Sequence, residues 1–334
     1  MRFVIMSLGS IGQRHLRNLR SAYPDAEIAV WRRAALEGDE LPAGADCLCL
    51  SLDEVLAFSP KAAIIASPAS AHLDAAVALA AEGVHLLIEK PLSVSAAGIY
   101  ELISCCQKNH IVLMVGYNLR FMPSLRRMRE LVRDGAIGEV ISARAEVGQY
   151  LPDWRPISDY RNTVSARAAL GGGVLLELSH DIDYMLWTLG LPISVTAIGG
   201  KFSDLDVDVE DLVELLLEYD NPRRLVSIHL DMLQHCPTRT CRLVGTEGVL
   251  VWDSIVDQLH LFKSNDKKWR QVNFLKRVDK NLMYLDQLTD FIECIQTGKR
   301  PSSGGCEGLQ VLQLIDAARD SMHAGCRVGI DWKL

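Results

Sequence analysis

The pattern of apolar and polar positions divides the chain near residue 120. Before that point, short continuous apolar runs alternate with segments of helical spacing. The runs predict strands at 3–6, 27–31, 62–67, 84–89 and 111–116, and the segments between them predict helices at 11–22, 70–82 and 94–108. Apolar strands that alternate with helices are typical of a parallel sheet covered on both faces. Right-handed crossovers then favour a doubly wound α/β domain.

The second part of the chain has a different pattern. A predicted helix at 122–134 is followed by a strand-like stretch at 139–148 and a polar, aromatic-rich loop at 149–169. Between 193 and 275, six short strand patterns are separated by turn signals, which predicts a mainly antiparallel sheet. Helical patterns at 281–297 and 305–323 close the sequence.

Composition and charge narrow the possible classes of protein. The 334 residues are 49% hydrophobic and 23% charged, as in an ordinary globular protein, and the net charge of −7 offers no basic footprint for nucleic acid. The nine cysteines form no C-x-x-C pair and no zinc-like spacing with histidine, so no metal site is predicted. An odd cysteine count without a secretory signal favours reduced thiols in the cytoplasm. No uncharged apolar run reaches the roughly 18 residues of a membrane span, so we expect a soluble protein.

A glycine loop follows the first predicted strand and opens the first helix. Gly9 and Gly12 occupy the second and third glycine positions of a G-x-G-x-x-G pattern, Ser7 replaces the first, and Ser10 and Ile11 lie between the glycines. Such a loop provides a tight turn, close backbone approach to a pyrophosphate and close helix packing. The backbone N–H groups at the helix start then bind the phosphates. The pattern predicts a dinucleotide site, and an ordinary strand-to-helix turn is the alternative.

The end of the second predicted strand bears on the choice of cofactor. A carboxylate there binds the ribose 2′-hydroxyl of NAD, whereas arginine accommodates the 2′-phosphate of NADP. This chain has Arg32 and Arg33 and no carboxylate at that place. NADP is therefore favoured and NAD is possible, unless both arginines are simply solvated. We expect an N-terminal Rossmann dinucleotide-binding domain over 1–120 and a C-terminal α+β domain with a large, mainly antiparallel sheet over 121–334.

Two further segments carry chemistry. Glu89 and Lys90 follow a buried strand at the carboxyl edge of the sheet, where open α/β sheets bind ligands. A partly buried lysine has a lowered pKa and can transfer protons, although a strand-end salt bridge would use the same residues. The segment GGGVLLELSHDIDY (171–184) places Glu177 and Asp183 one helical turn on either side of His180. From the residues alone, His180 is either a core histidine, the commoner case, or an acid/base group.

Five motifs in order resemble the glucose–fructose oxidoreductase/inositol dehydrogenase (Gfo/Idh/MocA) family over nearly the full length. They are SLGSIGQRH (7–15), SPASAH (67–72), EKPLS (89–93), GYNLRF (116–121) and GGGVLLELSHDIDY (171–184). The resemblance implies an NAD(P)-dependent oxidoreductase that acts on a hydroxyl or carbonyl of sugars, polyols or nucleotide sugars. It also implies a homodimer or homotetramer formed through the exposed face of the C-terminal sheet.

The resemblance assigns site residues by position. Lys90 and His180 match the groups that contact the reacting hydroxyl or carbonyl, and either is expected to serve as the base. The family often has Asp four residues before the histidine, where this chain has Leu176, so Glu177 is expected to take that role unless it is structural. Asp183 would orient the imidazole and is also expected to contact the substrate. The residues expected on the cofactor side are Ser67, Pro68, His72, Glu89, Lys90 and Asn118.

The loop before the glycines is the predicted substrate-binding segment. Its aromatic and basic residues are Tyr150, Trp154, Arg155, Tyr160 and Arg161. Because arginine pairs bidentately with carboxylate and phosphate, this loop favours an acidic sugar or a nucleotide sugar. A packing or interface loop is the alternative.

Two other functions fit the same family. One is a glycosidase that uses bound NAD in a redox-assisted cycle without net cofactor turnover, and the other is a non-catalytic nucleotide sensor. The presence of both Lys90 and His180 favours an enzyme over a sensor.

Overall fold

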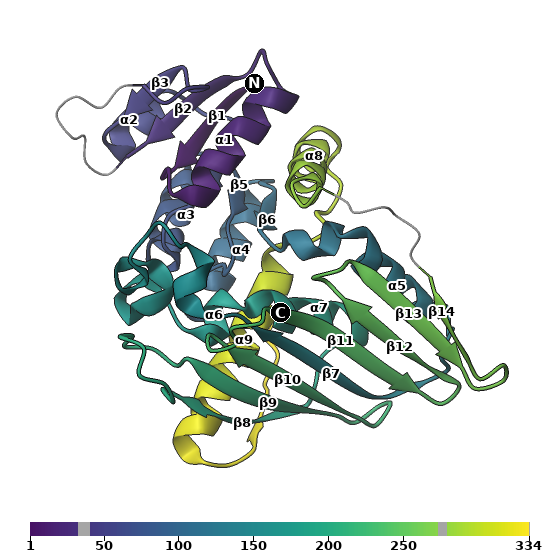
Figure 1. The fold of residues 1–334 in the computed structure, drawn as a ribbon. Coiled ribbons are helices and arrows are strands. Elements are labelled where there is room, and N and C mark those ends of the chain that lie inside the picture. The colour runs from purple at the N-terminus through teal and green to yellow at the C-terminus, as the bar shows by residue number, and fades with distance from the viewer. Residues whose placement is uncertain (33–40, 273–278, 334) are drawn as a thin grey trace. The chain divides into compact units, whose positions relative to one another are not determined.

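The computed structural model of the chain describes residues 1–32, 41–272 and 279–333 (Figure 1). The chain forms two compact units. The first contains Met1–Asn118 and Lys280–Leu309, and the second contains Leu119–Asp279 and Gln310–Lys333. The first boundary lies close to the expected one at residue 120. The structure differs in that the segment 280–309, expected in the C-terminal domain, belongs to the first unit.

The first unit contains a six-stranded sheet of order β3-β2-β1-β4-β5-β6, in which every neighbouring pair is parallel. Its strands are β1 (Arg2–Met6), β2 (Glu27–Trp31), β3 (Cys47–Cys49), β4 (Ala62–Ile65), β5 (His85–Ile88) and β6 (Leu113–Val115). Its helices are α1 (Ser10–Ala22), α2 (Leu52–Ala57), α3 (His72–Ala81), α4 (Ile99–Lys108) and α8 (Leu282–Thr297). The doubly wound α/β fold expected for this part is confirmed.

Helix α8 belongs to this unit because it completes its core. Leu288, Phe291 and Ile292 of α8 pack in one buried cluster with Phe3 of β1 and Leu19 of α1. Spacings of three and four residues put these apolar side chains on one face of the helix. The sequence predicts that apolar face but not the sheet that it covers.

The second unit contains a nine-stranded sheet of order β14-β13-β12-β11-β7-β10-β9-β8-β15. Its strands are β7 (Val140–Gly148), β8 (Ser194–Gly200), β9 (Leu212–Tyr219), β10 (Arg224–Asp231), β11 (Thr238–Gly245), β12 (Gly248–Asp253), β13 (Gln258–Lys263), β14 (Lys268–Gln271) and β15 (Val328–Gly329). All neighbouring pairs are antiparallel except β7 with β10, which pair in parallel. The mainly antiparallel sheet is therefore confirmed.

Helices cover one face of this sheet. They are α5 (Pro123–Arg133), α6 (Val174–Glu177) and α7 (Ser179–Leu189), and α9 (Gly305–Ala324) crosses the boundary between the units. The strands alternate buried and exposed residues, as expected for a sheet with one covered face. On the other face Ile198, Leu216 and Leu225 are exposed. Within the described residues, no helix has the length and apolar character needed to cross a membrane.

Candidate functional site

The loop between β1 and α1 meets the three requirements of a dinucleotide loop. Ser7 has φ +84°, the left-handed conformation usually reserved for glycine, so serine makes the tight turn in place of the missing first glycine. A Cβ on Gly12 would lie 3.1 Å from the Ser7 carbonyl carbon and closer still to its oxygen, so only glycine lets the helix approach the loop. A Cβ on Gly9 would have no atom of the described chain within 4 Å.

The start of α1 has donors to offer a phosphate. Gly9 is the N-cap residue and provides no side chain to cap the helix, and both Gly9 and Ser10 are exposed. The first N–H groups of a helix have no partner inside it and carry the positive end of the helix dipole. The loop therefore fits the pyrophosphate of a dinucleotide.

Of the two arginines expected to select the cofactor, only Arg32 can be described. It follows β2, is half-buried, and its backbone N–H donates to the carbonyl of Cys49 at 3.1 Å. Arg33 lies outside the described residues.

Glu89 and Lys90 follow β5 at the same carboxyl edge of the sheet as the glycine loop. The Glu89 carboxylate is buried and lies 2.7 Å from Nε2 of His15. Burial by itself would raise the pKa of Glu89, but the hydrogen bond and charge of His15, together with the charge and backbone N–H of Lys90, outweigh it and leave this pKa below its ordinary value. A Cβ on Gly116 would lie 2.8 Å from the same carboxylate, so glycine makes room for it. Glu89 thus fixes the turn that carries the half-buried Lys90.

The other residues expected on the cofactor side occupy the loops after β4 and β6. His72 is buried, with Nε2 2.7 Å from the carbonyl oxygen of Ser67 and Nδ1 2.9 Å from that of Pro91. Burial lowers the pKa of His72. The imidazole therefore links the loops after β4 and β5, which is a positioning role, while Pro68 is half-buried and Asn118 is buried.

In the second unit, each of the three consecutive glycines has a structural reason. Gly171 ends a short 3-10 helix with φ +86°, and a Cβ on Gly172 would lie 2.7 Å from the carbonyl oxygen of Ser165. Gly173 has φ +101°, and its Cβ would lie 2.6 Å from the carboxyl carbon of Glu210. That carboxylate accepts from the N–H of Leu175 at 3.2 Å, so it caps the start of α6. The glycines allow the loop and a carboxylate to approach the helix.

The segment expected to carry Glu177, His180 and Asp183 on successive turns of one helix forms two helices, α6 and α7, which join at Leu178. His180 is half-buried in the first turn of α7. Glu177 accepts from the hydroxyl of buried Ser165 at 2.9 Å. This bond favours the structural alternative for Glu177, because it anchors the loop before the glycines to α6.

Asp183 forms an ion pair that the sequence did not reveal. Its oxygens accept from Nε and Nη2 of Arg120 at 2.9 and 2.6 Å, and both side chains are buried. Arg120 comes from the GYNLRF motif and Asp183 from the HDID motif, so the pair joins two motifs 63 residues apart. Arg120 also lies over the ring of Trp187.

The comparisons with known proteins cover both units. Residues 1–117 match an oxidoreductase family with an NAD-binding Rossmann fold, and residues 125–251 match the GFO/IDH/MocA C-terminal domain. The chain belongs to the Gfo/Idh/MocA family. It is accordingly an oxidoreductase with an NAD-binding Rossmann domain, as the motifs predicted.

Relatives and solved structures match over almost the whole chain. Inositol 2-dehydrogenase of Rhizobium meliloti (strain 1021) is 25% identical over 340 residues, 99% of each chain. Levoglucosan dehydrogenase in complex with NADH and levoglucosan has a TM-score of 0.87 at 21% identity, over 100% of both chains. The WlbA dehydrogenase from Bordetella pertussis in complex with NADH and UDP-GlcNAcA has a TM-score of 0.83 at 20% identity, over 100% of this chain and 99% of that one. At such identities the structural similarity shows the fold.

The aromatic-rich loop of this family member is held by contacts within the loop and by contacts with residues that follow α7 in the chain. The Tyr150 ring lies 4.1 Å from that of His235, Trp154 donates to the carbonyl of Gln149, and the Tyr160 hydroxyl accepts from a backbone N–H. Arg161 forms an exposed ion pair with Asp159, and Arg155 is exposed. The structure thus gives Arg161 a carboxylate partner within the loop.

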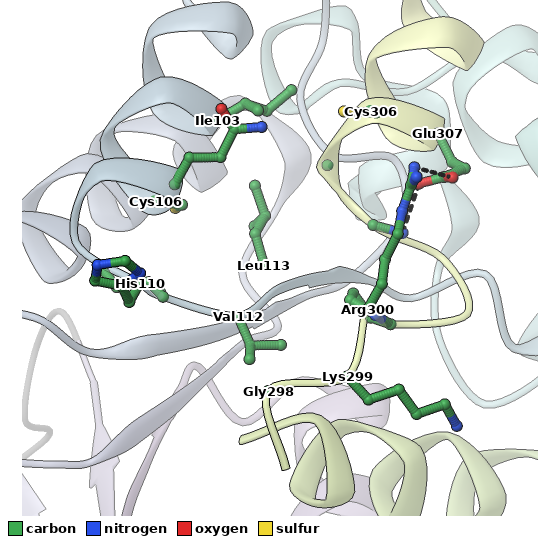
Figure 2. Close-up of a pocket in the computed structure, with 15 residues that line it drawn as sticks. Ile103, Cys106, His110, Val112, Leu113, Gly298, Lys299, Arg300, Cys306 and Glu307 are labelled. Carbon is green, nitrogen blue, oxygen red and sulfur yellow. Dashed lines mark hydrogen bonds and ion pairs between the residues drawn. The ribbon is translucent and has the colours of Figure 1, made fainter. Parts of the chain in front are cut away.

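A pocket of about 470 Å³ in the first unit lies apart from the glycine loop (Figure 2). Ile103 and Leu113 line its apolar side, and Arg300 lies across from them in an ion pair with Glu307. Val112 of this pocket precedes β6, whereas the family's cofactor motifs follow the carboxyl ends of the strands. We therefore assign it no part in cofactor binding.

Proposed function

We propose that this protein is an NAD(P)-dependent dehydrogenase or reductase that acts on a hydroxyl or carbonyl of a sugar or nucleotide sugar. The observation that carries the proposal is the Ser7–Gly12 loop, whose backbone satisfies each requirement for pyrophosphate binding. The names of the relatives, which include inositol, levoglucosan and nucleotide-sugar dehydrogenases, support the substrate class.

The chain's own groups would bind, orient and move a proton. A bound nicotinamide supplies the hydride acceptor or donor. The start of α1 holds the phosphates, and Glu89 keeps the turn at Lys90 in place. Either Lys90 or His180 takes the proton from the reacting hydroxyl during oxidation and returns it during reduction.

The catalytic assignment is tested with Lys90→Met and His180→Asn. Each is expected to bind NADH as the wild type does and to lose about 100-fold or more in kcat, the usual contribution of a general acid or base. Lys108→Met and His110→Asn, which change exposed residues of the same types, serve as controls. Myo-inositol, levoglucosan and UDP-GlcNAcA, taken from the names of relatives, are the first substrates to assay. Full activity in both variants would refute the assignment.

We further propose that NADP is the preferred cofactor, with Arg32 on its 2′-phosphate. Fluorescence titration with NADH and NADPH is expected to show tighter NADPH binding that Arg32→Ala abolishes. Arg17→Ala, an exposed arginine on α1, is the control. A preference for NADH in the wild type would disprove the role of Arg32 and leave the dehydrogenase proposal standing.

Location and assembly complete the proposal. We infer a cytoplasmic protein, because the thiols of all nine cysteines are free. We infer a homodimer or homotetramer that buries the exposed apolar residues Ile198, Leu216 and Leu225 on the open face of the second sheet. Light scattering of the wild type and of Leu225→Glu tests this, since a charge in the interface should release monomers.

A further inference from the structure

A buried polar cluster lies at the start of α7, next to His180. Asp181 follows His180 in the chain and is completely buried, and its carboxylate lies 3.2 Å from the guanidinium of Arg239. Tyr184, one turn further along α7, is also completely buried, and its hydroxyl and the Arg239 guanidinium both interact with the Asp181 carboxylate. The buried carboxylate is therefore satisfied within the chain, and it holds the guanidinium of Arg239 in a defined place.

The sheet sets the position of Arg239. Thr238, the first residue of β11, pairs with Gly148, the last residue of β7, so Arg239 lies at the end where β7 leads into the predicted substrate loop. Cys241, two residues further along the strand and therefore on the same face, contacts Met185 of α7. Arg239 thus lies on the helix-covered face, at the start of the helix that carries His180.

The two charges of the pair differ in access. The Arg239 side chain is 22% exposed, whereas Asp181 is 0% exposed. The Arg239 side chain is therefore partly open to an incoming group, whereas the Asp181 carboxylate is closed off. A guanidinium has five N–H donors in a planar fork suited to carboxylate and phosphate, and one ion pair leaves most of them available.

We propose that Arg239 binds an anionic group of the substrate, a carboxylate or a phosphoryl group, and that Asp181 holds the guanidinium in place from behind. This inference rests on the proposed function, because it takes the substrate to bind beside His180. It adds a specificity residue that the sequence patterns did not identify. The loop arginine expected to play this part, Arg161, is instead paired with Asp159.

The arrangement also predicts proton uptake on binding. Burial raises the pKa of Asp181, and the charge of Arg239 opposes that rise. An anion that shares the guanidinium weakens this opposition, so Asp181 gains affinity for a proton when the substrate binds. A pair with only a structural role would show no such uptake.

The test is isothermal titration of the NADH-loaded protein with UDP-GlcNAcA, UDP-N-acetylglucosamine and a neutral sugar, levoglucosan or myo-inositol. Arg239→Gln is expected to lose about 10- to 100-fold in affinity for an anionic sugar, as for a lost hydrogen bond to a charged group, and less than about 3-fold for the neutral one. Loss confined to UDP-GlcNAcA assigns a carboxylate, and equal loss for both nucleotide sugars assigns the diphosphate. Arg242→Gln, an exposed arginine on the same strand, should change nothing.

Controls separate binding from folding. The double variant Asp181→Asn/Arg239→Gln removes both charges, and it should regain any stability lost in Arg239→Gln while keeping the affinity defect.

Repeating the titration in buffers of different ionisation enthalpy should show proton uptake in the wild type and none in Asp181→Asn. Unchanged affinity for the anionic sugars in Arg239→Gln, or an equal loss for the neutral sugar, would overturn the inference. A wild type that binds NADH but neither nucleotide sugar would also overturn it and leave the proposed function intact, whereas failure to bind NADH and NADPH would defeat the proposed function itself.

Discussion

In the glycine loop, we expect a substitution at Gly12 to affect folding and a substitution at Gly9 to affect cofactor binding. In Gly12→Ala the new Cβ would lie 3.1 Å from the Ser7 carbonyl carbon, where carbon atoms ordinarily stay about 3.5–4.0 Å apart, and closer still to the oxygen. Backbone cannot rotate out of the way as a side chain can. Overpacking of this kind costs about 1–3 kcal/mol, and the better helix propensity of alanine offsets at most about 1 kcal/mol.

We therefore expect Gly12→Ala to lose about 2 kcal/mol in the free energy of unfolding, or roughly 4–8 °C in Tm for a unit of this size. Gly9→Ala should behave differently. Gly9 has φ −61°, which alanine accepts, and no atom of the described chain lies within 4 Å of its Cβ position. Its stability should fall by no more than about 1 kcal/mol, the usual cost of alanine at an N-cap.

Gly9→Ala should nevertheless weaken NADH binding by about 10- to 100-fold, the equivalent of one lost hydrogen bond to a charged group. Thermal unfolding monitored by circular dichroism and titration of NADH fluorescence measure the two effects separately. If Gly12→Ala melts at the wild-type temperature, the close approach of helix and loop is not what requires glycine. If Gly9→Ala binds NADH normally, its backbone does not meet the phosphates.

Three further predictions concern the second unit. Gly173→Ala should destabilise the protein by about 2 kcal/mol or more, because φ +101° and the neighbouring Glu210 carboxylate both exclude a Cβ. Urea denaturation measures the loss in the free energy of unfolding, and a loss below about 0.5 kcal/mol would contradict the prediction. Asp183→Asn should cost roughly 3 kcal/mol in the same assay by leaving the buried Arg120 charge without its partner, and a near-neutral effect would show that the pair contributes little. The pKa of His229 is raised from an ordinary 6.5 to about 9, chiefly by the hydrogen bond to Asp231 and also by the carboxylate of Glu214. Protonated His229 therefore adds on the order of 2 kcal/mol to the free energy of unfolding below pH 6.5, and this contribution is lost as the pH rises through about 9. His229→Gln should flatten the dependence of stability on pH across that window. A dependence identical to that of the wild type would refute the prediction.

The comparison of sequence and structure shows where local patterns suffice. The apolar runs identified the five main strands of the first sheet, because a strand buried on both faces needs a continuous apolar stretch. The motif spacing located the glycine loop, and Ser7 shows why a departure from the pattern is tolerated: its φ of +84° gives the turn that glycine usually makes. Five motifs in order were also enough to identify the family.

Other features were decided by contacts between distant parts of the chain. The apolar face of α8 was visible in the sequence, but its place against β1 and α1 was not, since such a face does not specify the surface that it covers. The parallel pairing of β7 with β10 depends on strands separated by more than 70 residues, beyond what alternation can indicate.

The candidate site shows the same division. The resemblance of the sequence motifs to the family assigned Lys90, His180 and Asp183 to the site, whereas the residues alone left His180 as a core histidine or an acid/base group. Only the tertiary structure gave Asp183 its partner Arg120 and paired Arg239 with Asp181, the residue after His180. The physical reason is that periodicity reports which face of an element is apolar, whereas the partner of a buried charge depends on how distant elements pack, and that information is spread over the whole chain.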